Sequence, residues 1–477
     1  MLKPLPAQQW SRENAVHLLN RAGFGATPEE IAVAEEAGLA KTLDRLLLAG
    51  PEPSAPADAS WTEPDDLGRR LRQARMANPD PAARRAQIKK AVGAQRDETA
   101  GLRRWWLDLM RRTQSPLAEK MTLFWHGHFA TSMQKVRNIY WMWRQNQTFR
   151  RYAFGNFRDL LKAVSRDPAM MVYLDLAQSK EEHPNENWSR EVMELFTLGI
   201  GHYSEQDVRE AARAFTGYKL NFVTQQFRYL PRLHDGGQKT FMNRTGHLDG
   251  DDILDTIVAQ PACAEFIAQK LWRFFAEDDP PNDIIQSLGA SLRGHNFELR
   301  PTLRDLFASS DFYADRIRRN QIKSPVQFLV GSCRLLETEL PPARVLNGAL
   351  AQLGQLLFAP PNVKGWDGGQ SWISTSTLLL RYNFADYLLQ GAPADQESDD
   401  DIRRAPLAPA RLIPENLRGK PEELVAHLAQ RLYQAPANEK LTKALLAYLK
   451  SRAPDTGDET IRRLLRLMMS TPQYQLV

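Results

Sequence analysis

The chain has 477 residues, 43% of them hydrophobic, and a chain of this length usually forms one large domain with a smaller one beside it. Its 62 Lys and Arg residues against 57 Asp and Glu residues leave a formal net charge of only +5, which argues against a nucleic-acid-binding protein. Acidic residues dilute the basic ones between Arg69 and Arg112, so we interpret that region as a solvated helical face and expect no nucleic-acid partner.

The sequence shows no evident segment for export or membrane insertion. Its first residues lack the apolar stretch of a secretory signal, and no run approaches the roughly 18–20 apolar residues that span a bilayer. We therefore expect a soluble protein without a transmembrane segment. It would be cytoplasmic as written, and periplasmic or secreted if a signal has been removed.

Apolar residues recur at helical spacing along most of the chain, which predicts a mainly α-helical fold. Near the start, Thr27 followed by Pro28 is typical of a helix N-terminus. Cys263 and Cys333 lie inside apolar helical patterns and are expected to be buried thiols. Two helices are predicted within residues 11–49 and long helices within 66–112. Further helices are predicted over about 116–127, 138–153, 156–165, 187–197, 251–257, 261–276, 281–293, 301–309, 324–338 and 342–356.

One region departs from this helical pattern. The runs Lys219–Val223 and Gln226–Leu230 flank a short polar turn and are predicted to pair as a small β-hairpin. The predicted fold class is therefore all-α, mainly helical, with one small β-hairpin.

The composition changes abruptly at residues 391–414, which are rich in Pro, Ala and charged residues, as linkers are. We predict a main helical domain over 1–390 that carries the polar site, and a small C-terminal helical domain over 415–477. Amphipathic helices are predicted in this C-terminal part at 421–434, 438–451 and 458–470.

The first polar segment is Phe124–Phe129, which contains His126 and His128. Imidazole is the commonest metal ligand and the usual acid–base group near neutral pH. Residues two apart do not face each other on a continuous helix, so a joint site requires Gly127 to break the helix. The alternative is a pair of hydrogen-bonded histidines among aromatic rings.

The second segment, Asn185–Phe196, places Asn187, Arg190, Glu191 and Glu194 on one narrow arc of a helix, opposite a broad apolar arc. The two carboxylates are three residues apart and project from one face, where they would bind a metal or divide acid and base roles. The alternative is a solvated stripe in which Arg190 pairs with an acid.

The third segment contains His234, Asp235 and Lys239 on a glycine-bearing loop. The His–Asp pair would supply a metal ligand and its orienting partner, or a base and its orienter, and Lys239 would hold an anionic group. Asp251 and Asp252 further along are explained as helix caps.

The fourth segment, Pro360–Trp372, carries Trp366 and Trp372 on a long glycine-rich loop. Long irregular loops in compact domains are often functional, so the two indoles would stack on a sugar or close over a substrate. The alternative, with both rings packed inward, is equally compatible with the sequence.

Together these segments favour a metal-assisted hydrolase in which a water activated by a divalent metal ion attacks an ester, glycosidic or phosphate bond. Two alternatives remain open: a metal-free acid–base enzyme acting on glycans, and a non-catalytic binding or assembly module. The candidate residues fall into three sets. The metal ligands are His126, His128, His234 and Asp235; the catalytic groups are Glu191, Glu194, Arg190 and Lys239; the substrate-binding groups are Asn187, Trp366 and Trp372.

Several segments in this order resemble the bacterial domain-of-unknown-function family 1800, from about residue 12 to the C-terminus. The resemblance implies an extracytoplasmic setting and a partner protein similar to alkaline phosphatases and sulfatases, and it supplies no catalytic residues to carry over. The segments that carry it are Asn20–Gly25, Phe124–Phe129, Asn185–Leu195, Ala214–Gly217, His234–Thr240 and Pro361–Trp366.

Overall fold

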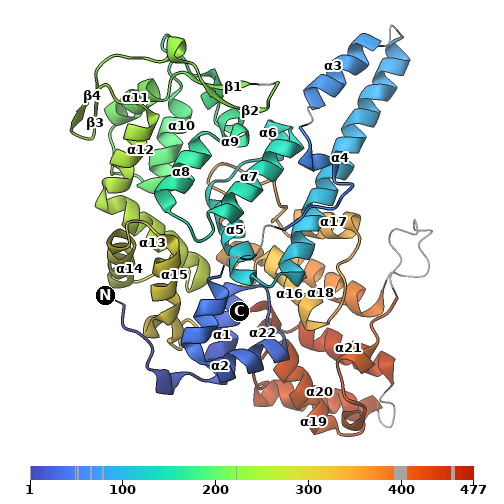
Figure 1. The fold of residues 1–477 in the computed structure, drawn as a ribbon. Coiled ribbons are helices and arrows are strands. Elements are labelled where there is room, and N and C mark those ends of the chain that lie inside the picture. Colours follow the sequence, from blue (N-terminus) through green and yellow to red (C-terminus); the bar gives the residue numbers. More distant parts are fainter. Residues whose placement is uncertain are drawn as a thin grey trace.

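The computed structural model is mainly α-helical, which confirms the predicted fold class (Figure 1). It describes residues 2–48, 50, 53–64, 67–77, 80–221, 223–391, 405–452 and 457–477. The predicted linker, 391–414, falls mostly outside these described residues. Among the helices that the structure describes, none combines the length and the apolar character that a membrane crossing requires.

The N-terminal helices begin where their capping residues predict. Thr27 caps α2 in a capping box with Glu30, and Pro28 is the first residue of that helix. The next two helices, α3 and α4, form an antiparallel hairpin that projects from the body (Figure 1). The bounds are α1 Arg12–Ala22, α2 Pro28–Leu46, α3 Leu67–Ala77 and α4 Pro81–Arg112.

The central helices lie in the middle of the chain; α5 packs mainly against α7, and α13 packs mainly against α14. The residues of α5 from Leu117 to His126, and His128, are buried, so this helix has no solvent-facing side over that length. The bounds are α5 Pro116–His128, α6 Met133–Val136, α7 Ile139–Arg151, α8 Phe157–Ser165, α9 Pro168–Tyr173, α10 Glu186–Glu191, α11 Glu205–Ala214, α12 Gly250–Ala259, α13 Pro261–Phe275, α14 Asn282–Gly294 and α15 Leu299–Ala308.

Two small antiparallel hairpins interrupt the helices. The predicted one is confirmed as β1 (Tyr218–Asn221) paired with β2 (Gln226–Tyr229). A second, β3 (Lys239–Phe241) with β4 (Arg244–Gly246), was not predicted. Its turn residues Met242 and Asn243 both have positive φ, as a type I′ hairpin turn requires, but their sequence is not the usual Asn-Gly.

Five of the C-terminal helices that the structure describes were predicted, whereas α18 and the short α22 were not. The bounds are α16 Pro325–Leu335, α17 Ala343–Gln352, α18 Thr375–Gln390, α19 Pro421–Leu432, α20 Glu439–Arg452, α21 Asp458–Met469 and α22 Pro472–Gln475. Leu424 of α19 and Leu464 of α21 belong to the same hydrophobic cluster as Phe328 of α16 and Leu388 of α18. The division into two domains stays a prediction.

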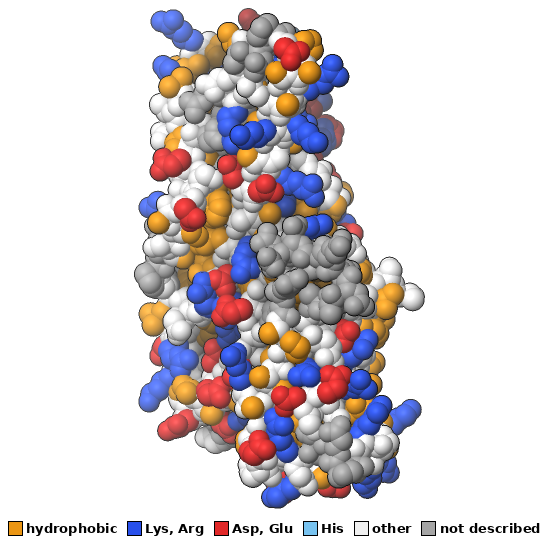
Figure 2. Space-filling model, turned by 90° about the vertical axis from the view of Figure 1, so that its right-hand side faces the viewer, with side chains coloured by type: hydrophobic (Ala, Val, Ile, Leu, Met, Phe, Trp, Pro, Cys, Tyr) orange, Lys and Arg blue, Asp and Glu red, His pale blue; other side chains and the backbone are white. Residues whose placement is uncertain are grey.

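The helix α5 lies between the two main hydrophobic clusters. Trp125 belongs to the cluster that also contains helices α8 to α15, and Leu123 belongs to the cluster of α4, α7 and the C-terminal helices. Cys263 and Cys333 are buried free thiols, one in each cluster, as predicted. On the outside, Lys, Arg, Asp and Glu side chains are interspersed over the face shown in Figure 2.

Candidate functional site

His126 and His128 occupy the end of α5, and main-chain groups engage both rings. The helix continues through Gly127 to His128, so the helix break that a joint site of the two histidines requires does not occur. The two rings therefore point in different directions. His126 Nε2 accepts a hydrogen bond from the backbone N–H of Phe358 at 2.9 Å. His128 Nε2 lies 3.0 Å from the carbonyl oxygen of Phe196, which only accepts, so this nitrogen donates.

Burial holds both imidazoles neutral. It lowers the pKa of His126 and of His128 to about 3, and the nearby cations Arg103 and Lys270 contribute to these shifts. The ring of His126 is enclosed by the rings of Trp106, Phe358 and Trp366, at centroid distances of 5.3, 5.0 and 5.6 Å. These contacts match the alternative to a joint metal site, in which the two histidines are hydrogen-bonded among aromatic rings.

The loop after α17 packs directly on the end of α5. Gly365 has φ +88°, and a Cβ at this position would stand 2.2 Å from the carbonyl oxygen of Gly127. Trp366 lies against His126, and Trp372 is buried. The structure thus brings together residues 124–129, 192–199 and 358–366, and we call this region the central junction.

Glu191 and Glu194 lie where α10 passes into a π-helix, Val192–Thr197. Both carboxylates are half-buried, and the hydroxyl of Tyr203 donates to Glu194 Oε2 at 2.7 Å. Burial and the negative charge of Glu194 raise the pKa of Glu191. Trp188 and Phe196 are buried on the opposite side, as the predicted arc requires.

The other two polar residues of this arc have structural partners. Arg190 forms a two-pronged ion pair with Glu205 at 2.6 and 2.8 Å and lies 3.5 Å from Glu186. Asn187 is exposed and donates weakly to the carbonyl oxygen of Leu174 at 3.4 Å. Arg190 is therefore engaged by acids outside the predicted site.

The polar side chains of the third segment, His234 to Lys239, bond to that segment itself and to residues of α11 and just after it. Asp235 pairs with Arg213 at 2.6 Å, and His234 Nδ1 lies 3.0 Å from the carbonyl oxygen of Thr216. Lys239 is buried and donates to the carbonyl oxygens of Asp235 and Gly237. Within the described residues, no hydrogen bond or ion pair joins this segment to the central junction.

The proposed metal ligands do not form one cluster in the part of the chain that the structure describes. There, no group of three or more His, Cys, Asp or Glu side chains is placed to hold a metal ion. The structure brings three of the four predicted segments together, but through ring packing and main-chain hydrogen bonds.

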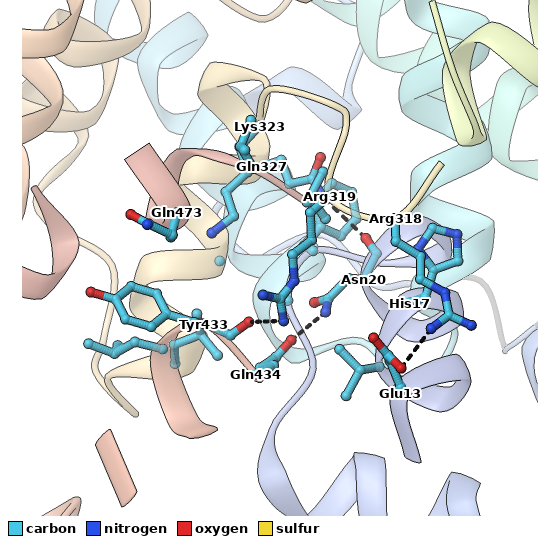
Figure 3. A pocket seen from close by; sticks show the side chains of 18 residues that line it. Glu13, His17, Asn20, Arg318, Arg319, Lys323, Gln327, Tyr433, Gln434 and Gln473 are labelled. Atoms are coloured by element: carbon cyan, nitrogen blue, oxygen red, sulfur yellow. Dashed lines mark hydrogen bonds and ion pairs between the residues drawn. The ribbon is translucent and has the colours of Figure 1, made fainter. Parts of the chain in front are cut away.

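A cavity that the sequence did not predict as a site lies elsewhere, between α1, the segment before α16, α16 itself, the end of α19 and α22 (Figure 3). Its enclosed part has about 50 Å³ of room, and its empty space of about 680 Å³ includes open solvent. Asn20 and Phe24 of the segment Asn20–Gly25 line one wall. Asn20 donates to the side chain of Gln434, and Gln327 donates to the carbonyl oxygen of Asn20 at 3.1 Å.

Two cations line this cavity without an acidic partner among the described residues. Lys323 Nζ donates to the carbonyl oxygen of Tyr474 at 2.6 Å and lies 4.1 Å from the centroid of its ring. Arg319 donates to the carbonyl oxygen of Tyr433 at 3.2 Å. Burial, together with Arg381 and Arg319, lowers the pKa of Lys323 to about 7.

Among the described residues that line the cavity, one is an Asp or Glu. This is Glu13, which pairs with Arg318 at 2.7 Å. His17, another lining residue, has a pKa lowered well below its usual value by burial and by Arg21, so it is neutral. We call the space lined by Asn20, Phe24, Arg319, Lys323 and Gln473 the cationic cavity.

The chain belongs to the family described as "Protein of unknown function (DUF1800)", whose model matches residues 17–476. This confirms the resemblance seen in the sequence. Neither the curated proteins nor the solved structures contain a match to the chain.

Proposed function

We propose that this protein is a binding protein, in which the central junction braces the fold and recognition of another molecule is the function. The observation that carries the proposal is the state of the two histidines in the most histidine-rich segment. Both are buried, neutral and engaged at Nε2 by the main chain. Each ring keeps a second nitrogen, Nδ1, but both side chains are buried, whereas a catalytic or metal-binding imidazole presents its free nitrogen to the substrate or to the ion.

Metal-assisted hydrolysis at Glu191 and Glu194 is the second candidate. It is favoured by the raised pKa of Glu191 beside a second carboxylate, an arrangement that separates acid and base roles in many enzymes. The rare π-helix that carries Glu194 also favours it, since such turns are frequent at functional sites. In the glycan version of this candidate, Trp366 and Trp372 would contribute sugar stacking, although Trp372 is buried.

A binding protein would also fit the partner that family resemblance implies, a phosphatase- or sulfatase-like protein. No residue of this chain is assigned to that contact. The proposal therefore concerns the chain's own recognition of a molecule, and the partner remains a separate expectation.

Elemental analysis separates the two candidates. Wild-type protein and the Glu191→Gln and His128→Ala variants are incubated with Zn²⁺ or Mn²⁺, desalted and analysed, with Glu186→Gln as the matched exposed control on the same helix. We expect no stoichiometric metal in any sample. An equimolar metal that Glu191→Gln and His128→Ala lose and Glu186→Gln keeps would overturn the proposal.

A further inference from the structure

We propose that the cationic cavity binds a small organic anion, a carboxylate or phosphate attached to an apolar group, with its charged end held between Arg319 and Lys323. This inference rests on the proposed function, because it names the ligand class of a binding protein. The cavity is small, because its enclosed part has about 50 Å³ of room and the empty space of about 680 Å³ includes open solvent. That room suffices for a few water molecules, so only a small ligand, or the charged end of a larger one, would fit inside it.

Unused hydrogen-bond donors line the cavity. A lysine ammonium has three N–H groups and a guanidinium has five. Lys323 uses one on the carbonyl oxygen of Tyr474, and Arg319 uses one on that of Tyr433. The side-chain amide of Gln473 makes no hydrogen bond within the described residues. Together these groups leave several donors for the oxygens of one anionic group.

The surrounding charge is positive. Arg381 is fully buried behind Lys323 and donates to its carbonyl oxygen at 2.8 Å and to the amide oxygen of Gln475 at 3.2 Å, both of them neutral acceptors. Bringing cations together away from water costs free energy unless an opposite charge compensates them. Among the described residues that line the cavity, Glu13 is the one Asp or Glu; it pairs with Arg318 and attracts Arg319 without forming an ion pair with it. An anionic ligand would place negative charge directly at Arg319 and Lys323.

The remaining walls are apolar and fixed. Phe24, Leu335 and Leu432 are buried lining residues, so the body of the ligand would contact hydrocarbon and an aromatic ring. The hydrogen bonds from Asn20 to Gln434 and from Gln327 to Asn20 tie three of the walls together (Figure 3). A site formed in advance loses less entropy when it binds.

The test is isothermal titration calorimetry of the full chain with benzoate and with phenyl phosphate, and with neutral benzamide as the uncharged match for benzoate. Two variants remove the cations, Lys323→Met and Arg319→Gln. Arg319 is exposed, so its variant is expected to fold even if the other does not. Arg316→Gln is the control, because Arg316 lies in the same segment, is exposed and pairs with Glu277 outside the cavity.

We expect benzoate or phenyl phosphate to bind in a 1:1 ratio and benzamide not to bind. Each cavity variant should weaken that binding by about tenfold or more, because a charge-assisted hydrogen bond is lost, and Arg316→Gln should not. Binding of the carboxylate alone or of the phosphate alone would identify the charged group.

Equal binding of benzamide, unchanged affinity in both cavity variants, or no binding of either anion would overturn the inference. None of these results would overturn the broader proposal of a binding protein. That proposal fails instead on a stoichiometric metal held by the Glu191 and His128 side chains, whatever the anions do.

Discussion

The central junction and the cationic cavity are both rich in polar side chains, but they differ in how those side chains are satisfied. In the junction, His126 and His128 are neutral and bonded to main-chain groups contributed by distant segments. In the cavity, Arg319 and Lys323 have no acidic partner among the described residues and retain free donors, and the pKa of Lys323 is lowered to about 7. Clustered polar residues with satisfied hydrogen bonds brace the fold of this protein, whereas unused hydrogen-bond donors favour a binding site.

Gly365→Ala in the central junction should have the largest effect on stability. The new Cβ would overlap the carbonyl oxygen of Gly127, and φ is +88° there. We expect a loss of about 3 kcal/mol or more in the free energy of unfolding, or failure to fold. Gly127→Ala is the control, since its Cβ would stand 3.9 Å from Trp366 inside a helix and should cost less than about 1 kcal/mol. Urea denaturation measures both, and equal losses would refute the tight contact.

Removal of either junction histidine should have the next largest effect. His126→Ala and His128→Ala each delete a buried ring and a hydrogen bond to the main chain, so we expect each to cost about 2–4 kcal/mol. The control is His247→Ala, because His247 is exposed and its ring, like that of His128, bonds to a carbonyl oxygen, that of Gly236. If the junction variants were as stable as this control, the rings would not brace the fold.

The junction should also make the protein sensitive to acid. The pKa of His126 and of His128 is about 3 in the fold against a usual 6.5, so the unfolded chain binds protons more readily. Their contribution to stability is complete above pH 6.5 and is lost as the pH falls towards 3. Denaturation midpoints at pH 7 and pH 5 should differ less in His126→Gln than in wild type. An unchanged difference would contradict the lowered pKa.

Glu191→Gln should have the smallest effect and the opposite sign. Because burial and Glu194 raise the pKa of Glu191, its ionised form is disfavoured in the fold. The amide removes that cost, so the variant should gain up to about 1 kcal/mol at neutral pH and nothing below the usual pKa of 4.5. Thermal unfolding at pH 7 and pH 4 measures this. A destabilised variant at pH 7 would indicate that the carboxylate has a favourable partner.

The local pattern of the sequence predicted most of the helical fold. Thr27 and Pro28 placed the start of α2, and the amphipathic spacing near residue 424 placed α19. These features depend on neighbours along the chain. The second hairpin was missed because Met242 and Asn243 adopt positive φ without the usual turn sequence.

The candidate site was harder to predict because its residues are far apart in the sequence and come together only in the folded chain. The sequence analysis identified His126 as a candidate. It could not predict the hydrogen bond that His126 accepts from the Phe358 N–H, because the two residues are more than two hundred positions apart in the chain. The cationic cavity has the same origin, since Asn20, Lys323 and Gln473 come from three distant segments. The segment Asn20–Gly25 resembled a family signature in the sequence, but no chemical role for it followed from the sequence. The structure places it in the wall of the cationic cavity.

The most direct test of the account is a thermal unfolding series on wild-type protein with Zn²⁺, Mn²⁺, benzoate and phenyl phosphate, beside Lys323→Met and His128→Ala. If the cationic cavity is the binding site, at least one anion should raise the melting temperature of wild type and of His128→Ala but not of Lys323→Met. Neither metal should raise it. A rise with metal that His128→Ala abolishes, together with no response to the anions, would contradict the account and restore the junction as the functional site.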